Sequence, residues 1–265
     1  MCASRSPDFV EAIARGFEVI RSFDGAPSQT LREVSERAAL ARPTARRVLI
    51  TLEELGYVQA DGGRFELTPR VLALGVAYYA GADFWSGAVS RLRRLVELTG
   101  ESCSIAQLDG SDIVYVARVA VPKLVTLSVA VGTRFPAPQT SLGKVLLANL
   151  EPGDLDSVLA EPSRSGVEAT WQPTRGELDA VLAEVRENGW AVSDQQLAPA
   201  IRSVAAPIRR ADGSVFAAVN VNAHAGETPV ARLTDEHLPH LLRTAGDLSV
   251  DYALRARIPA AAASY

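Results

Sequence analysis

Residues 43–55 constrain the fold more than any other segment, because they predict a helix with two chemically different sides. At 100° per residue, one side is an apolar stripe made of Ala45, Val48, Leu49, Leu52 and Leu55. The opposite side carries Arg46 and Arg47, with Thr44 on the flank. Pro43 suits the first helical turn, where its missing N–H would be unpaired anyway. Such a helix must pack on a small core by its apolar side while its arginines face solvent.

The segments on either side of this helix predict a winged helix-turn-helix. Residues 9–23 form an apolar pattern with spacings of three and four (Val10, Ile13, Phe17, Ile20). Residues 31–39 predict a second helix, with Thr30 as its cap and Glu33 at the capping-box offset. Two short β-prone runs, 57–60 and 64–67, surround a Gly-rich turn and predict a hairpin.

This arrangement places the arginines of the third helix where a recognition helix contacts DNA. Thr44, Arg46 and Arg47 are expected to reach base edges in the major groove, and Arg42 and Arg64 to contact phosphates. A different interpretation is a three-helix protein-interaction module with a solvated arginine face. A chain with a net negative charge can still bind DNA, because binding depends on the electrostatic field at the contact surface and not on the total charge. The net charge is −4, yet residues 1–70 carry ten basic and ten acidic side chains, so the excess negative charge lies after residue 70.

Composition excludes several classes of protein. Apolar residues make up 48% and charged residues 22% of the 265 residues, as in globular proteins rather than disordered chains. The apolar stretch 71–82 is too short to span a bilayer, and the N-terminus lacks the apolar segment of a secretory signal. Cys2 and Cys103 are far apart and form neither a disulfide framework nor a zinc site. We therefore expect a cytoplasmic protein without a membrane segment.

The remainder of the chain predicts an α+β domain with a mostly antiparallel sheet. Residues 71–81 predict a helix that is apolar on nearly all sides and must be covered, either by its own domain or by a partner. Strand-like runs are then interrupted by helices, with a hairpin turn at 109–112. The expected strands are 102–108, 113–119, 124–131, 190–193, 202–208 and 215–222, and the expected helices are 86–98, 140–150, 151–160, 174–188 and 234–257.

Two features of this second domain suggest a site for an anion. Thr140 and Ser141 begin a helix, whose free N–H groups and positive dipole end attract negative charge, and Arg134 could return as a carboxylate partner. Asn220 and Asn222 are two residues apart and share one sheet face, where a dry core would make their amides costly. The alternatives are that Thr140 only caps its helix, that Arg134 is solvated, and that the amides lie on an exposed face.

The sequence carries one weak signal of catalysis. Ser141-Leu-Gly-Lys144 matches the S-x-x-K spacing of a serine nucleophile and a lysine base, but the accompanying K-T-G and S-D-N motifs are absent. G-x-S-x-G, H-E-x-x-H, P-loop and dinucleotide motifs are also absent. We therefore expect no catalytic residues, no metal site and no cofactor. A small-acid-binding enzyme and a protein-interaction scaffold without DNA binding remain the alternatives.

Residues 9–23, 30–38, 44–58 and 131–144 together resemble the IclR family of bacterial transcription regulators, and the resemblance extends from about residue 8 to residue 257. It implies a winged helix-turn-helix domain over 8–69, a linker helix over 70–84 that makes interdomain and dimer contacts, and a GAF-like effector-binding domain over 85–258. Residues that correspond to the family's effector pocket are Arg134, Thr140, Ser141, Leu142, Ser193, Asp194, Ser203, Asn220 and Asn222. Arg118 and Arg202 are weaker candidates.

Residues 6–11 and the loop 131–144 resemble a narrower branch of that family, the regulators of aromatic-acid catabolism. This branch responds to protocatechuate, 4-hydroxybenzoate or β-ketoadipate. The resemblance implies a homodimer or tetramer that binds double-stranded operator DNA under the control of a small organic acid. The residues expected to lie at the DNA are Thr30, Arg42, Pro43, Thr44, Arg46, Arg47 and Arg64.

Overall fold

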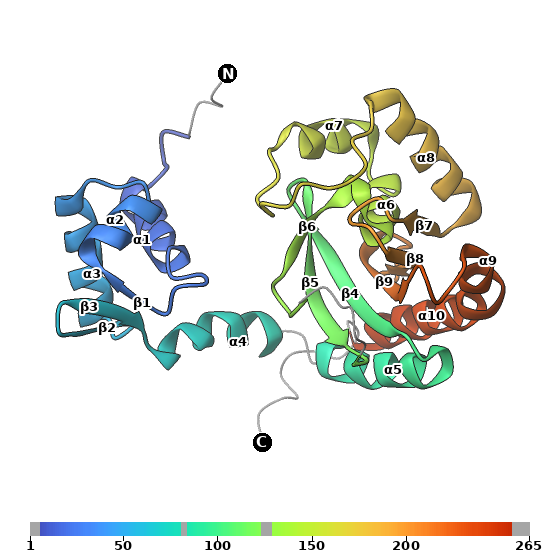
Figure 1. Ribbon diagram of the computed structural model, residues 1–265, viewed down its shortest axis with the longest axis horizontal. Helices are drawn as coiled ribbons and strands as arrows, with labels where there is room; N and C mark the ends of the chain where they lie inside the picture. The colour runs from blue at the N-terminus through green and yellow to red at the C-terminus, as the bar shows by residue number, and fades with distance from the viewer. Residues whose placement is uncertain (1–5, 81–83, 123–128, 256–265) are drawn as a thin grey trace. The chain divides into compact units, whose positions relative to one another are not determined.

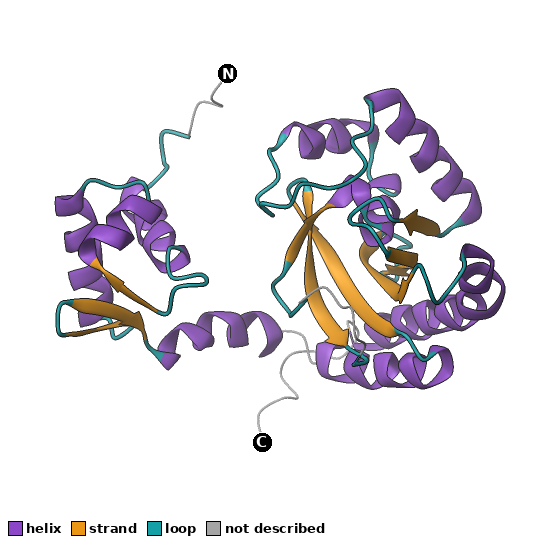
Figure 2. Ribbon diagram, viewed as in Figure 1, coloured by secondary structure: helices purple, strands orange, loops and turns teal. Residues whose placement is uncertain are grey.

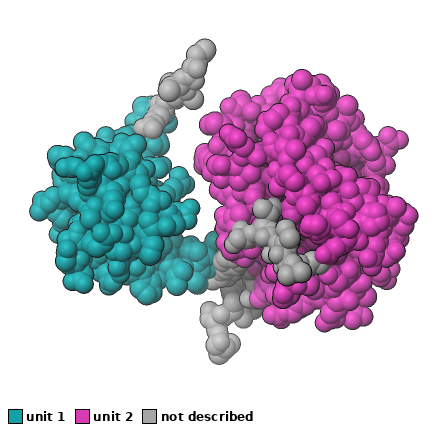
Figure 3. Space-filling model, viewed as in Figure 1, with its two compact units in different colours: residues 1–82 teal, residues 83–265 magenta. Residues whose placement is uncertain are grey.

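The computed structural model describes residues 6–80, 84–122 and 129–255 (Figure 1). The chain divides into two compact units, Met1–Ala82 and Asp83–Tyr265 (Figure 3). The first contains three helices and a three-stranded sheet, followed by a further helix. The second contains a six-stranded sheet with helices.

The first unit is a winged helix-turn-helix. Its elements are α1 (Glu11–Arg21), β1 (Ser28–Thr30), α2 (Leu31–Arg37), α3 (Arg42–Glu54), β2 (Val58–Asp61) and β3 (Arg64–Leu67). Strands β2 and β3 form the expected hairpin, and β1 adds an antiparallel strand at the edge of β3 that the sequence pattern did not predict. The core of this unit consists of Val19, Phe23, Val34, Ala38, Leu49, Leu52 and Val58.

Only part of the apolar pattern of residues 9–23 packs against the core, where Ile20 is half-buried. Val10, Ile13 and Phe17 are 55%, 59% and 50% exposed, whereas Val19 and Phe23 lie in the core. The spacing does not select the buried side, because residues 9–23 are apolar on more than one side. Periodicity alone then cannot select the side that faces the core.

A short 3₁₀ turn (Pro69–Val71) and helix α4 (Leu72–Ala80) follow the wing. Leu72 and Val76 of α4 are 70% and 59% exposed. The last part of the expected linker, residues 81–83, lies outside the described residues.

The second unit is built on one antiparallel sheet with the strand order β6-β5-β4-β9-β8-β7. The strands are β4 (Ser102–Asp109), β5 (Asp112–Val119), β6 (Arg134–Pro136), β7 (Ala191–Asp194), β8 (Ile201–Arg209) and β9 (Val215–His224). Most of the expected strand 124–131 lies outside the described residues, while residues 129–131 are in no strand. Strand β6 was not predicted.

Helices cover the sheet of this unit, with the sheet between α6 and the pair α5 and α10 in Figure 1. The helices are α5 (Phe84–Thr99), α6 (Ser141–Ala148), α7 (Pro152–Ala160), α8 (Arg175–Asn188), α9 (Val230–Arg232) and α10 (Leu238–Arg255), and a π-helical turn (Leu233–His237) joins the last two (Figure 2). The architecture is α+β with a mostly antiparallel sheet, as the sequence predicts.

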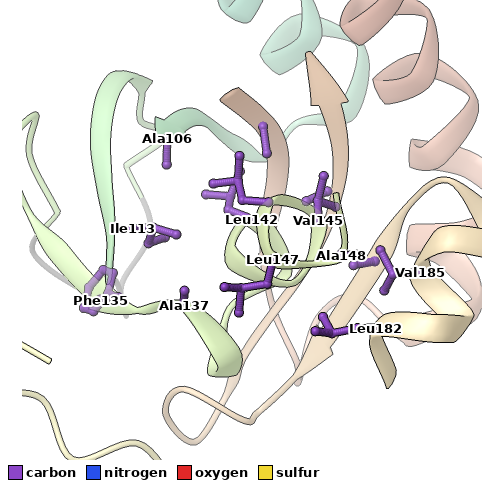
Figure 4. Packing of buried hydrophobic residues seen from close by; sticks show 14 of the residues in the cluster. Ala106, Ile113, Phe135, Ala137, Leu142, Val145, Leu147, Ala148, Leu182 and Val185 are labelled. Carbon is purple, nitrogen blue, oxygen red and sulfur yellow. The ribbon is translucent and has the colours of Figure 1, made fainter. Parts of the chain in front are cut away.

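Helix α6 lies at the centre of the second unit, and all eight of its residues are buried. Figure 4 shows Ile113 and Phe135 on one side of this helix, and Leu182 and Val185 of α8 on the other. A Cβ at Gly143 would lie 2.1 Å from the carbonyl oxygen of Ala137. The start of α6 therefore packs directly on the backbone of the preceding 3₁₀ turn, Ala137–Gln139, and only glycine permits this approach.

Candidate nucleic-acid interface and effector site

The arginines of α3 face solvent. Arg42, Arg46 and Arg47 are exposed, whereas Ala45 and Leu49 on the other side of the helix are fully buried. Within the described residues these three guanidinium groups make no hydrogen bond or ion pair. Their charges are therefore free to meet phosphates and base edges.

The other predicted DNA-contacting residues have structural roles as well. Pro43 is exposed in the first turn of α3, and Thr44 is half-buried beside it. The Thr30 hydroxyl accepts from the Glu33 N–H (3.3 Å) and the Thr30 N–H donates to Glu33 Oε2 (2.6 Å), which forms the predicted capping box of α2. Hydrogen bonds from the Thr30 backbone and hydroxyl hold the pKa of Glu33 below its ordinary value. The Thr30 side chain is thus engaged in the fold.

Arg64 on the wing is held against β1. Its Nε donates to Ser28 Oγ (3.0 Å), its Nη2 donates to the Ser28 carbonyl oxygen (2.7 Å), and Nη2 lies 3.6 Å from Glu33 Oε2. The side chain is still 48% exposed. A phosphate contact by Arg64 would have to compete with these bonds, unlike a contact by Arg46 or Arg47.

Arg134 is not placed as a free carboxylate partner. Its Nη2 lies 2.6 Å from Asp109 Oδ2, and its Nε lies 3.4 Å from Oδ2 of the buried Asp112. These ion pairs form because β6 pairs with β5 directly beside the 109–112 turn. We correct the expectation accordingly: the guanidinium is already neutralised by the protein's own acids.

Asp194 also departs from the expected pocket. Arg202 donates from Nε to Asp194 Oδ1 (2.8 Å) and from Nη2 to Asp194 Oδ2 (3.0 Å). Residues alternate along β7 and β8, so this ion pair lies on the opposite sheet face from Ser193 and Ser203. Asp194 and Arg202 therefore neutralise each other away from the remaining predicted effector residues.

Several predicted residues do meet at the start of α6. Ser141 Oγ lies 2.7 Å from Ser203 Oγ on β8, and Ser193 Oγ donates to the Gln139 carbonyl oxygen at 2.7 Å. Thr140 Oγ1 caps the helix by accepting from the Gly143 N–H at 2.9 Å. Leu142 is fully buried in the apolar core. The helix start is thus fixed against β7 and β8 by buried hydroxyl groups.

Polar side chains line the sheet face that these hydroxyl groups share. Strand register pairs Ser104 with both Arg118 and Asn220, and pairs Asn222 with both Ser102 and Ser203. Asn220 is 2% exposed and Asn222 is half-buried, so the two amides share one largely buried face. We call this set the polar face; its members are Ser102, Ser104, Arg118, Ser193, Ser203, Asn220 and Asn222. Sequence reasoning missed Ser102 and Ser104, although their two-residue spacing was a usable signal.

Ser141 and Lys144 have separate hydrogen-bond partners. Lys144 is 2% exposed, donates from Nζ to the Val192 carbonyl oxygen (2.9 Å) and to Gln196 Oε1, and lies over the Trp171 ring at 5.1 Å. Burial lowers the pKa of Lys144 to about 8. The Ser141 hydroxyl instead bonds Ser203. A proton shared between this serine and lysine, which S-x-x-K chemistry requires, is not provided by these contacts.

Two features are absent from the residues that the structure describes. No group of three or more His, Cys, Asp or Glu side chains there could hold a metal ion. Among the same residues, no helix is both long and apolar enough to cross a membrane.

Comparison with protein families gives two matches that together extend over most of the chain. The IclR helix-turn-helix domain matches residues 12–62, and the C-terminal domain of the bacterial transcriptional regulator IclR matches residues 76–250.

Individual relatives agree with these matches. The Pca regulon regulatory protein of Pseudomonas putida is 37% identical over 244 residues, which cover 91% of this chain and 84% of that protein. The p-hydroxybenzoate hydroxylase transcriptional activator of Acinetobacter baylyi is 32% identical over 254 residues, or 92% of each chain.

Solved structures show the same architecture. A transcriptional regulator from Rhodococcus sp. RHA1 has 42% identity and a TM-score of 0.79, with 93% of this chain and 100% of that chain covered. An IclR homolog from Microbacterium hydrocarbonoxydans, solved in complex with 4-hydroxybenzoate, has 23% identity and a TM-score of 0.76, with 93% and 100% coverage. At that identity, the second likeness concerns the fold alone.

Proposed function

Because the chain belongs to the IclR family of bacterial transcriptional regulators, we propose that α3 reads operator DNA and that a small organic acid bound in the second unit controls this reading. The observation that carries the first part is the set of exposed, unpaired arginines on α3. The acid is aromatic or dicarboxylic, and the regulated genes belong to aromatic catabolism, as the names of the Pca and p-hydroxybenzoate relatives suggest.

The proposed DNA contacts are of two kinds, contacts to base edges in the major groove and contacts to phosphates. Arg46 and Arg47, with Thr44, enter the major groove, and Arg42 contacts phosphate with help from the wing residue Arg64. A homodimer or tetramer would present two copies of α3 to a pseudo-palindromic site. Thr30 and Pro43 shape the ends of α2 and α3 and position these contacts.

The effector site is proposed on the polar face beside the start of α6. Ser141, Ser203, Asn220 and Asn222 supply hydrogen-bonding groups, and Thr140 fixes the helix end. The acid can shift DNA binding only through unequal affinity for two arrangements of the protein, typically about 1–3 kcal/mol of coupling. Such coupling changes the DNA affinity roughly 5–150-fold.

The test begins by selecting a preferred duplex from a random library with the full-length protein. Fluorescence anisotropy then compares this duplex with a scrambled duplex for wild type, Arg46→Ala and Arg94→Ala. Arg94 is a matched control because it is an exposed arginine of the second unit, paired with Glu97. Arg46→Ala should lose about 1–3 kcal/mol on the selected duplex and much less on the scrambled one. Equal losses on both duplexes contradict base reading by Arg46.

The effector is tested by thermal shift and by the same anisotropy assay. Benzoate, 4-hydroxybenzoate, protocatechuate and β-ketoadipate are added to the full-length protein with and without the selected duplex. At least one acid should both raise the melting temperature and change the DNA affinity. An acid that binds without changing the DNA affinity contradicts the regulatory role of the site.

A further inference from the structure

We propose that Arg118 anchors the carboxylate of the effector, at a polar row that Arg118, Ser104 and Asn220 form on the adjacent strands β5, β4 and β9. This inference rests on the proposed effector function and names the residue that would give the site its preference for acids.

The strand register places these three side chains next to one another. Ser104 on β4 pairs with Arg118 on β5 and with Asn220 on β9, so all three point to the same side of the sheet. Arg118 Nη1 donates to Ser104 Oγ at 2.9 Å, which holds the guanidinium over β4 and toward Asn220. The row belongs to the polar face that also meets Ser141 through Ser203.

Arg118 differs from the other arginines considered for this site because it has no acidic partner among the described residues. Arg134 is paired with Asp109 and Asp112, and Arg202 is paired with Asp194. Arg118 makes its hydrogen bond to a neutral serine, and its buried Nε has no hydrogen-bond partner. A half-buried cation without a counter-ion and with a buried, unpaired Nε–H donor is unfavourable, and a bound carboxylate would remedy both defects.

Asn220, on the other side of Ser104, has a buried hydrogen-bond acceptor without a partner. It is 2% exposed, and its Oδ1 has no hydrogen-bond partner. A ligand that offers a carboxylate to Arg118 and a hydroxyl donor to Asn220 satisfies both atoms. Hydroxylated organic acids have this combination of groups, whereas simple hydrocarbons and cations do not.

The surroundings of the row suit an aromatic ring. Tyr115 and Phe135 meet edge to face with centroids 5.9 Å apart, and they share one apolar cluster with Leu142. Burial raises the pKa of Tyr115 to about 12, and the positive charge of Arg118 acts in the opposite direction. Tyr115 pairs with Ala106 on β4, two residues from Ser104 on the same sheet face, so these rings lie beside the row.

Isothermal titration calorimetry on the full-length protein tests the assignment. Each acid of the panel is paired with its uncharged amide, for example 4-hydroxybenzoate with 4-hydroxybenzamide. Arg118→Gln should weaken acid binding roughly tenfold to a hundredfold and leave amide binding nearly unchanged, because only the charge-assisted bonds are lost. The matched control is Arg134→Gln, which should bind the acid as wild type does.

Two further variants keep the test decisive if Arg118→Gln does not fold. Arg118→Lys keeps the charge but removes the fork of donors, so acid binding should weaken less than in Arg118→Gln. Asn220→Asp adds a competing negative charge next to Arg118 and should also weaken acid binding more than amide binding. Circular dichroism of each variant checks that the fold is intact.

The outcomes separate this inference from the proposed function. If wild type binds an acid and Arg118→Gln binds it equally well, Arg118 is not the anchor while the proposed function stands. The same conclusion follows if acid and amide lose affinity equally. If wild type binds no acid of the panel, the proposed effector class fails, and the role of Arg118 fails with it.

Discussion

The contribution of Lys144 to the stability of the second unit should rise as the pH increases from 8 to 10.5. The side chain is 2% exposed and contacts the Val192 carbonyl oxygen, Gln196 and the Trp171 ring. Burial lowers the pKa of Lys144 from 10.5 to about 8. Between these values the unfolded chain holds a proton that the folded protein has released. The Lys144 contribution to the free energy of unfolding therefore increases with pH in this window.

The magnitude follows from the two pKa values. Each pKa unit is equivalent to about 1.4 kcal/mol, so the full shift corresponds to roughly 3 kcal/mol once the window has been crossed. Between pH 7 and pH 9.5 the linkage relation gives about 2 kcal/mol. Cys103 and Tyr115 act in the opposite direction, because burial raises the pKa of each to about 12. The pH dependence of wild-type stability would therefore combine the contributions of Lys144, Cys103 and Tyr115.

The assay compares wild type with Lys144→Met, which keeps the length of the side chain and removes its titration. Urea unfolding is followed by tryptophan fluorescence at pH 7 and pH 9.5. This signal reports on the second unit because Trp85, Trp171 and Trp190 all lie there. Wild type should gain about 2 kcal/mol relative to the variant between the two pH values. A difference that stays constant with pH refutes the argument that Lys144 is neutralised inside the protein.

Three further substitutions test the packing and the local backbone. Gly143→Ala should destabilise the second unit by about 1–3 kcal/mol or more, because its Cβ would lie 2.1 Å from the Ala137 carbonyl oxygen. The control Gly153→Ala has open space, and equal unfolding midpoints for the two variants contradict the overlap. Ala39→Gly should stabilise the first unit by up to about 1 kcal/mol, because Ala39 has φ +52°; an unchanged melting temperature by circular dichroism argues against strain there. Thr30→Ala should cost about 1 kcal/mol by removing the capping box, while Thr30→Ser should not, and equal melting temperatures would contradict this.

The sequence predicts the solvent-exposed side of α3 well because its apolar residues form one main stripe. When this stripe packs on the core, the arginines on the opposite side of the helix must face solvent, and the structure places them there. Helix α1 shows the limit of the same reasoning. Val10, Ile13 and Phe17 form a regular stripe that the fold leaves exposed, while Val19 and Phe23 are buried. Periodicity identifies a possible buried side, but packing decides between two apolar sides.

The proposed effector site shows a different limit: the sequence pattern predicts which sheet face a side chain lies on, but not which residues it pairs with. Alternation along a strand correctly places Asn220 and Asn222 on one face, since the side-chain period of two is a local property. Arg134 looked like a free cation because nothing within its own loop neutralises it. The acids that do so, Asp109 and Asp112, arrive only when β6 pairs with β5. Arg118 is the converse case, because its neighbours across β4 are a serine and an asparagine. Strand order therefore determines which arginine has no acidic partner and can pair with a ligand. The order of the strands in a sheet cannot be predicted from the residues next to each arginine.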